Sequence, residues 1–227
     1  LYSSAASDVY KRQIILKSTK ARNTMFVSFE GCEGVGKSTQ LKLLKDYLES
    51  TNQHAVYVRE PGSTHISEQI RKIILNPENE EMTGVTEAYL YASSRAQLVR
   101  EVIKPALERG ELVVCDRYVD SSIAYQGYAR GLGADLIKKI NAPAIDGLLP
   151  DITIFLDLKP SEAWRTFRIT DDRLELESAD FHDRVYAGYN AEIAGSDTRF
   201  VRIKPDFDKN VTSQKIIEAL RQRGAIK

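Results

Sequence analysis

One short segment constrains the fold of this chain more than any other: Gly-Cys-Glu-Gly-Val-Gly-Lys-Ser at positions 31–38. It matches the pattern GxxxxGK[ST] at every fixed position, an apolar run precedes it and an amphipathic pattern follows it. A strand, a glycine-rich loop and a helix in this order hold phosphate. The loop N–H groups turn inward and the helix N-terminus adds partial positive charge. The segment therefore predicts a nucleoside triphosphate site.

The residues assigned to this triphosphate site are Gly31, Cys32, Glu33, Gly34, Val35, Gly36, Lys37, Ser38 and Thr39. We expect Lys37 to reach the β- and γ-phosphates and the Ser38 hydroxyl to hold Mg²⁺. Asp116 ends another apolar run and is the second predicted metal residue, acting through water. A turn or helix cap is the alternative role for Asp116. Cys32 is interpreted as a small space-filling residue rather than a redox switch.

Five apolar runs predict strands, at residues 25–30, 55–60, 112–117, 152–158 and 200–204. Several are continuously apolar and rich in β-branched residues, which is typical of strands buried on both faces of a parallel sheet. Helical patterns lie between them at 38–50, 86–109, 161–167, 180–193 and 211–223, and we expect Pro105 to kink or divide the longest. This alternation predicts an α/β fold with a doubly wound, five-stranded parallel sheet.

Composition excludes several classes of protein. Charged residues make up 28% of the chain, and 32 basic residues balance 32 acidic ones. Zero net charge gives no basic surface, so nucleic acid is not a predicted partner. No apolar run reaches the roughly 18 residues of a membrane span, so no membrane partner is predicted. Two cysteines are too few for a disulfide framework and fit a reducing compartment, so we expect a cytoplasmic protein.

The first 24 residues differ from the rest. The segment SSAASDVYKRQ at 3–13 can be back-translated into a common sequencing adapter. Residues 1–24 are therefore interpreted as a non-native extension outside the fold. A natural tail or a transit peptide is the alternative, because the stretch 11–22 is basic and lacks acidic residues. We expect one domain over 25–227, starting at Met25.

Five blocks, in order, resemble the thymidylate kinase family of the bacterial type. They are FEGCEGVGKSTQ (29–40), REPGST (59–64), SSRAQ (93–97), DRYVDSSIAYQG (116–127) and DDRLE (171–175), within a resemblance that spans 25–223. REPGST together with DRYVDSSIAYQG is far more specific than the phosphate loop alone. The resemblance implies a P-loop nucleoside monophosphate kinase fold, ATP and dTMP as substrates, Mg²⁺, and a homodimer. A GTPase is disfavoured, because the chain has no DxxG or NKxD motif.

The resemblance implies that Arg59 and Arg117 grip the acceptor phosphate. Arginine suits this task because its planar fork donates two parallel hydrogen bonds. Tyr125 would pack near the sugar C2′ and disfavour a ribose hydroxyl, and Glu33 would accept from the deoxyribose 3′-hydroxyl. A surface salt bridge is the alternative role for Arg59, and core packing is the alternative for Tyr125.

The resemblance also implies a set of residues around the base. Tyr91 would stack on thymine, and Arg95, Ser122 and Gln126 would meet its polar edge. Tyr91 and Arg95 are four residues apart on a predicted helix and so share one face. Core packing is the alternative for Tyr91. Ser94 replaces the Asp usual in the family beside Arg95.

A lid is expected over about 161–178, with catalytic arginines at Arg165, Arg168 and Arg173 acting together with Lys37 and Arg117. The phosphate loop has no arginine between Gly31 and Lys37, which agrees with the family's lid-arginine type. A solvated, charged helix face is the alternative reading of this run. Ile169 replaces the lid glycine usual in the family.

The reaction implied is Mg²⁺-dependent transfer of the ATP γ-phosphoryl group to dTMP, giving dTDP and ADP. The attacking phosphate oxygen is already anionic, so positioning and charge stabilisation would carry the catalysis. Two alternatives stay open at this point. One is a kinase for another pyrimidine nucleoside monophosphate (dUMP, UMP or CMP), and the other is a nucleotide-binding homologue without kinase activity.

Overall fold

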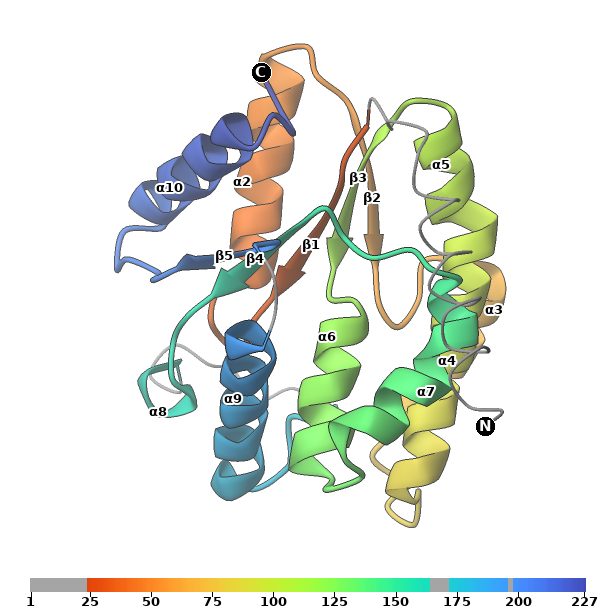
Figure 1. Ribbon diagram of the computed structural model, residues 1–227. Helices are drawn as coiled ribbons and strands as arrows, with labels where there is room; N and C mark the ends of the chain where they lie inside the picture. Colours follow the sequence, from red (N-terminus) through yellow and green to blue (C-terminus); the bar gives the residue numbers. More distant parts are fainter. Residues whose placement is uncertain (1–23, 164–171, 196–197) are drawn as a thin grey trace, which may run out of the picture.

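A computed structural model describes residues 24–163, 172–195 and 198–227. Its centre is one parallel sheet with strand order β2-β3-β1-β4-β5 (Figure 1). The strands are β1 (Phe26–Glu30), β2 (Ala55–Arg59), β3 (Leu112–Asp116), β4 (Ile152–Leu156) and β5 (Phe200–Ile203). Each lies within a predicted run, so the expected five-stranded parallel sheet is confirmed.

The helices of the described residues connect these strands. They are α2 (Lys37–Ser50), α3 (His65–Leu75), α4 (Gly84–Leu98), α5 (Lys104–Glu108), α6 (Val119–Ser122), α7 (Ala134–Ile145), α8 (Pro160–Ala163), α9 (Ala179–Ala194) and α10 (Lys209–Gln222), with π-helical turns η1 (Val99–Ile103) and η2 (Ile123–Ala129). Helices α3, α6, η2 and α7 had no counterpart in the predicted set. Of the helix predicted at 161–167, residues 164–167 lie outside the described residues.

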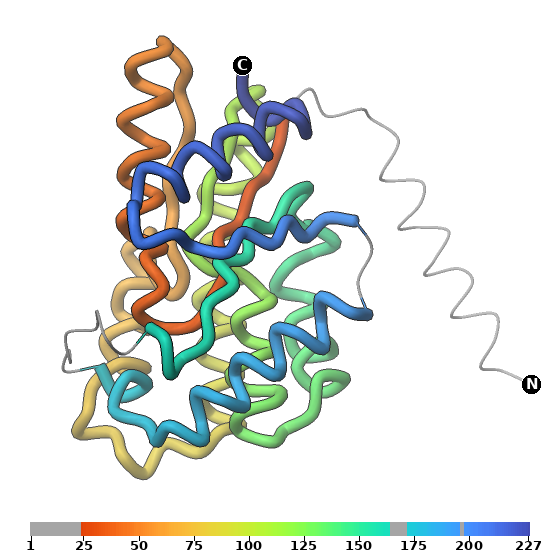
Figure 2. Tube along the Cα trace, turned by 90° about the vertical axis from the view of Figure 1, so that its left-hand side faces the viewer, coloured from red at the N-terminus to blue at the C-terminus, as the bar shows by residue number. Residues whose placement is uncertain are grey.

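The sheet is buried on both faces, which explains its continuously apolar strands. On β3, Val113 and Cys115 belong to a cluster with apolar residues of α4, η1, α5 and α7, whereas Val114 belongs to the cluster with α2, α9 and α10. Successive side chains of a strand point to opposite faces, so both sets must be apolar. Figures 1 and 2 show α2 and α10 side by side at one face of this sheet.

Pro105 divides the long helical segment as predicted. Helix α4 ends at Leu98, the π-helical turn η1 follows, and Pro105 stands in the first turn of α5. Proline has no N–H for the helical ladder and its ring crowds the preceding turn, so a wider turn just before it relieves both problems.

Two expectations fall wholly or partly on segments that are not described. Of the proposed non-native extension at 1–24, residues 1–23 lie outside the described residues. Of the expected lid at about 161–178, residues 164–171 lie outside them, so both stay predictions. Among the described residues, none of the helices combines the length and apolar character needed to cross a bilayer.

Gly188 gives a prediction about packing. A Cβ added at this position of α9 would lie 2.9 Å from both Cβ and Cγ of Tyr128 in η2. Helix propensity alone would make Gly188→Ala stabilising by about 1 kcal/mol. We instead expect the clash to lower the free energy of unfolding by about 1–3 kcal/mol, measured by urea denaturation.

Gly195→Ala is the matched control, because a Cβ there meets nothing closer than 3.5 Å. Its effect should stay within about 0.5 kcal/mol. A stabilised Gly188→Ala variant would contradict the close packing of α9 on η2.

Candidate functional site

Strand ends and adjoining helices enclose one cavity of about 380 Å³. The carboxyl ends of parallel strands meet at one edge of the sheet, where α/β proteins bind their ligands. Thirteen of the predicted site residues line it: Glu33, Gly34, Gly36, Lys37, Ser38, Thr39, Arg59, Tyr91, Asp116, Arg117, Ser122, Tyr125 and Gln126. Residues far apart in the chain therefore form one site.

The phosphate loop has the backbone that its sequence requires. Gly31 and Gly36 adopt φ angles of 147° and 92°, a region that favours glycine. Within the described part of the chain no side chain caps α2, so its first N–H groups are left for an anion. Lys37 Nζ donates to the carbonyl oxygens of Gly31 and Cys32 at 3.0 and 2.9 Å, which folds the lysine over the loop.

Glu33 joins the phosphate loop to Arg117 and to Tyr125 of η2. Its Oε1 accepts from Arg117 Nη2 at 2.5 Å and from the Tyr125 hydroxyl at 2.8 Å. Burial by itself would raise the pKa of the Glu33 carboxyl. The charges of Arg117 and Lys37 and the Tyr125 hydrogen bond outweigh it and lower the pKa to about 2. Glu33 is therefore an anionic acceptor throughout the physiological pH range.

Arg117 is held from several directions. Its Nη1 donates to Gly31 O, Ser121 Oγ and Tyr189 Oη at 3.0–3.1 Å. Its backbone is left-handed, with φ 66°, a conformation that costs a non-glycine residue on the order of 1 kcal/mol. This turn redirects the chain as β3 ends and places the guanidinium beside the phosphate loop.

Glu30 positions two of the groups that accept hydrogen bonds from Arg117. The Glu30 carboxylate accepts from the Tyr118 N–H, the Ser121 hydroxyl and the Tyr189 hydroxyl at 2.6–2.9 Å. Ser121 and Tyr189 are the same groups that accept from Arg117. Glu30 was not among the predicted site residues, because it precedes the phosphate loop. In the structure it lies outside the cavity wall.

The REPGST segment forms a turn that is held by Glu68. Ser63 has φ 70°, a left-handed backbone conformation that favours glycine. Its N–H donates to Glu68 Oε1 at 2.7 Å, and Glu68 Oε2 pairs with Arg59 at 3.0 Å. Ser67 of α3 is connected to α4 by the hydrogen bond from Ser67 Oγ to Ser94 O, at 2.9 Å.

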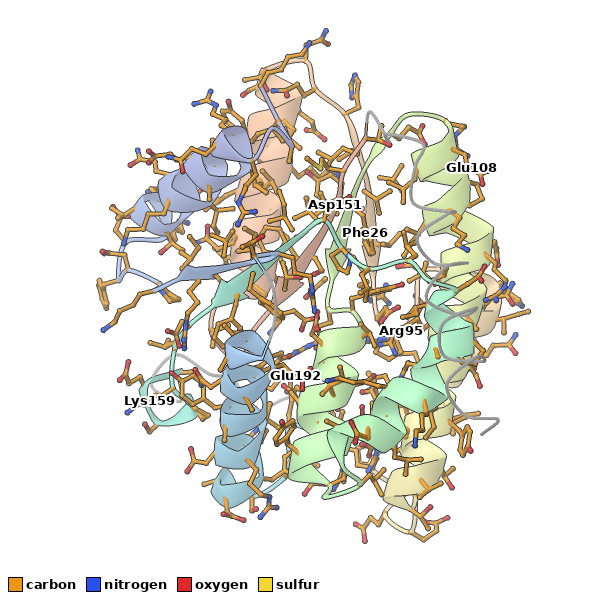
Figure 3. The ribbon with its side chains drawn as sticks, viewed as in Figure 1. Phe26, Arg95, Glu108, Asp151, Lys159 and Glu192 are labelled. Atoms are coloured by element: carbon orange, nitrogen blue, oxygen red, sulfur yellow. The ribbon has the colours of Figure 1, made fainter. Side chains whose placement is uncertain are left out.

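Arg95 is placed differently from the expectation that it meets the base edge. Its side chain is 1% exposed and does not line the cavity. It donates twice to Glu60 Oε2, to Ser122 Oγ at 3.1 Å and to Asn141 of α7. Figure 3 shows Arg95 in the interior beside α7. A buried guanidinium needs such partners, and here they hold it behind Ser122.

The three lid arginines divide into two groups. Arg165 and Arg168 lie outside the described residues. Arg173 is 9% exposed, pairs with Glu87 at 2.5 Å and donates to Ile74 O at 3.0 Å. Figure 2 shows the chain before α9 next to the chain that leaves α3, where the Arg173 N–H also donates to Leu75 O. In this arrangement the Arg173 side chain contacts α4 and the end of α3 and is turned away from the phosphate loop.

The predicted metal residues Ser38 and Asp116 share the cavity. Asp116 Oδ1 is buried and has no hydrogen-bond partner among the described residues. The same residues contain no cluster of three or more His, Cys, Asp or Glu side chains that could hold a metal alone. A lone carboxylate and a hydroxyl suit Mg²⁺, which takes few protein ligands and completes its shell with water and phosphate.

Further residues line the cavity that sequence analysis did not name: Glu60, Pro61, Arg71, Leu75, Ser121, Asp172, Leu174 and Glu175. Three of the predicted residues, Gly31, Cys32 and Val35, contribute backbone or packing and not cavity wall. The blocks REPGST, DRYVDSSIAYQG and DDRLE already contain six of the missed residues, so including every residue of these blocks would have found them.

The Glu30 carboxyl predicts a pH dependence of stability. Burial raises its pKa to about 7, and the charge of Asp120 adds to the rise. The folded chain therefore binds this proton more tightly than the unfolded chain. The stabilising contribution is complete below about pH 4.5 and is lost as the pH rises toward 7, at up to about 1 kcal/mol per pH unit.

Glu30→Gln imitates the protonated form and should flatten the fall in Tm between pH 5 and 8. Glu111→Gln, which changes an exposed carboxylate, should keep the slope of the wild-type protein. An identical slope in Glu30→Gln and wild type would rule out Glu30 as the titrating group.

Comparison with known proteins agrees with this geometry. The family model described as "Thymidylate kinase" matches residues 29–216. A thymidylate kinase of Thermoanaerobacter sp. (strain X514) is 50% identical over 179 residues, which cover 78% of this chain and 88% of the relative. One from Exiguobacterium sp. is 44% identical over 211 residues, covering 89% and 99%. One from Bacillus pumilus is 46% identical over 180 residues, covering 78% and 85%. The chain belongs to the thymidylate kinase family.

Proposed function

We propose that this protein transfers the γ-phosphoryl group of ATP to dTMP, giving dTDP and ADP. The observation that carries the proposal is the single cavity that joins the phosphate loop to Arg59, Tyr91 and Gln126, in a chain of this family. A dTMP phosphate oxygen attacks the γ-phosphorus in line, and the bond to the β-phosphate oxygen breaks.

The donor side is the phosphate loop. Backbone N–H groups of residues 31–39 and the uncapped start of α2 would hold the ATP phosphates. Lys37 would exchange its two carbonyl partners for β- and γ-phosphate oxygens and so stabilise the transferring group. A lysine held in this way is a point charge already placed at the loop.

Ser38 and Asp116 are the proposed residues for Mg²⁺, and the unpartnered Oδ1 of Asp116 supports the assignment. When bound, the ion would neutralise phosphate charge and fix the geometry of the triphosphate. The family implies this ion. Removal of divalent cations with EDTA should abolish turnover, and Mg²⁺ should restore it.

On the acceptor side, Arg59 and Arg117 would bind the dTMP phosphate. Tyr91 would stack on the base, and Tyr125 and Glu33 would border the sugar. The short Tyr125–Glu33 hydrogen bond supports this, because Glu33 is anionic there and ready to accept from a 3′-hydroxyl. Ser122 and Gln126 would meet the base edge, with Arg95 acting on Ser122 from behind.

A lid over about 161–178 remains part of the proposal. Arg165 and Arg168 are its proposed catalytic arginines. Arg173 would serve catalysis only if it left Glu87, so its ion pair favours a role in fixing the base of the lid. The domain is proposed to extend over 25–227, with 1–24 as an added segment.

We also propose that the protein is a homodimer and is located in the cytoplasm. Ile66 and Ile73 of α3 and Tyr89 of α4 are 49–57% exposed and offer apolar surface on neighbouring helices. Both cysteines, Cys32 and Cys115, are buried and unpaired, which suits a reducing compartment. Sedimentation equilibrium would measure the oligomeric state.

An acceptor panel tests the reaction itself. ADP release with MgATP should be fastest with dTMP among dTMP, dUMP, UMP, CMP, AMP and GMP. A preference for another pyrimidine monophosphate would indicate that alternative kinase. ATP binding with no turnover of any acceptor would indicate a nucleotide-binding homologue.

Lys37→Ala should lower kcat for dTMP by at least about a hundredfold, because a preorganised charge at the transferring group is lost. Lys42→Ala is the matched control, since Lys42 is an exposed lysine of the same helix. The quantity measured is ADP release at saturating MgATP and dTMP. Retained kcat in Lys37→Ala would contradict the phosphate-loop assignment.

Arg59→Ala should raise KM for dTMP at least about tenfold and change kcat less, because a charge-assisted contact to the acceptor is removed. Arg109→Ala removes an arginine from an exposed ion pair away from the cavity and should leave KM unchanged. An unaltered KM in Arg59→Ala would show that Arg59 serves only its surface pair with Glu68.

A further inference from the structure

Glu87 is a buried carboxylate that sequence analysis did not single out. It lies on α4 with no exposed side-chain surface and pairs with Arg130 at 3.0 Å and Arg173 at 2.5 Å. Its Oε1 also accepts from Gln126 Nε2 at 2.8 Å. The groups that contact the Glu87 carboxylate, two guanidinium groups and one amide N–H, are all donors, so Glu87 acts as a hydrogen-bond acceptor here.

This contact determines which end of the Gln126 amide a bound molecule would meet. Gln126 lines the cavity and is 1% exposed. One N–H of its Nε2 donates to Glu87, whereas its Oε1 is buried and has no partner among the residues described. Turning the amide over would press Oε1 against a carboxylate, so the cavity is offered an acceptor.

Ser122 supplies the complementary group. Its Oγ accepts from Arg95 Nη1 at 3.1 Å, which leaves its O–H to donate into the cavity. Ser122 and Gln126 therefore offer a donor and an acceptor. Thymine and uracil present the matching pair, the O4 acceptor and the N3–H donor. Cytosine presents the opposite pair, an N4 amino donor and an N3 acceptor.

We propose that Glu87 is a positioning residue that sets the base specificity of the acceptor site, because it fixes the orientation of the Gln126 amide. Arg130 and Arg173 hold the carboxylate in place, and Arg130 is itself held by Glu177 at 2.6 Å. The inference rests on the proposed function and names the base edge that this site accepts: one with an N3–H beside a carbonyl oxygen.

The test is Glu87→Gln, assayed with dTMP, dUMP and dCMP. An amide at position 87 can donate as well as accept, so Gln126 gains the freedom to turn. The ratio of kcat/KM for dTMP to that for dCMP should fall at least about tenfold, while the ratio of dTMP to dUMP stays the same. If Glu87 had only a structural role, kcat/KM would fall by the same factor for all three acceptors. An unchanged dTMP-to-dCMP ratio would overturn the proposal.

Glu177→Gln is the matched control. It makes the same chemical change in the same ion-pair network, through Arg130, without a hydrogen bond to Gln126, and both ratios should stay at wild-type values. The double variant Glu87→Gln/Arg130→Gln removes one charge of each sign. If the single variant fails to fold, the double variant is assayed in its place, and it should show the same fall in the dTMP-to-dCMP ratio.

A second measurement needs no substitution. N3-methyl dTMP lacks the N3–H, so the wild-type protein should use it at least about tenfold less well than dTMP. Equal use would overturn the acceptor role of Gln126. If the protein turned over no monophosphate, the proposed function would fail. The ratio of calorimetric Kd values for dCMP and dTMP, in wild type and Glu87→Gln, would then still decide the role of Glu87.

Discussion

The guanidinium of Arg117 joins parts of the chain that would otherwise have no common geometry. It donates to groups of the phosphate loop, α6, η2 and α9. Charge-assisted hydrogen bonds of this kind are short and directional, so they hold one arrangement of these elements. Because Arg117 follows β3 in a left-handed turn, the end of the central sheet determines where this cluster forms. The cavity depends on it, since its wall includes residues from three of these elements.

Two glutamates of one short segment, Glu30 and Glu33, have pKa values shifted in opposite directions. Glu33 is surrounded by Arg117, Lys37 and the Tyr125 hydroxyl, so its pKa falls to about 2. Glu30 is only three residues earlier, but burial and the nearby Asp120 raise its pKa to about 7. The first, Glu33, is an anion that lines the cavity. The second is a buried group that holds the donors around Arg117. Environment, and not residue type, separates the two roles.

The local sequence pattern predicted all five strands of the sheet but not every helix. The strands were predictable because burial on both faces requires unbroken apolar runs. Helix α7 was not predicted, since Gly131 and Gly133 precede it and Pro143 lies inside it. Helix α6 is only four residues long, too short to show a helical period. The π-helical turn η2 also departs from the 3.6-residue period on which helix prediction depends. Helix α3 carried a readable signal in the Thr64 cap and its isoleucines, and it was overlooked.

The sequence by itself determined the parallel sheet, the phosphate loop, the family and most of the cavity wall, because these depend on residue type and spacing along the chain. Only the tertiary structure decided that Arg95 lies behind Ser122, that Arg173 pairs with Glu87, and that Glu87 accepts a hydrogen bond from Gln126. The physical reason is the cost of burying charge. A buried arginine or glutamate must find a partner, and the partner is set by which helices pack together.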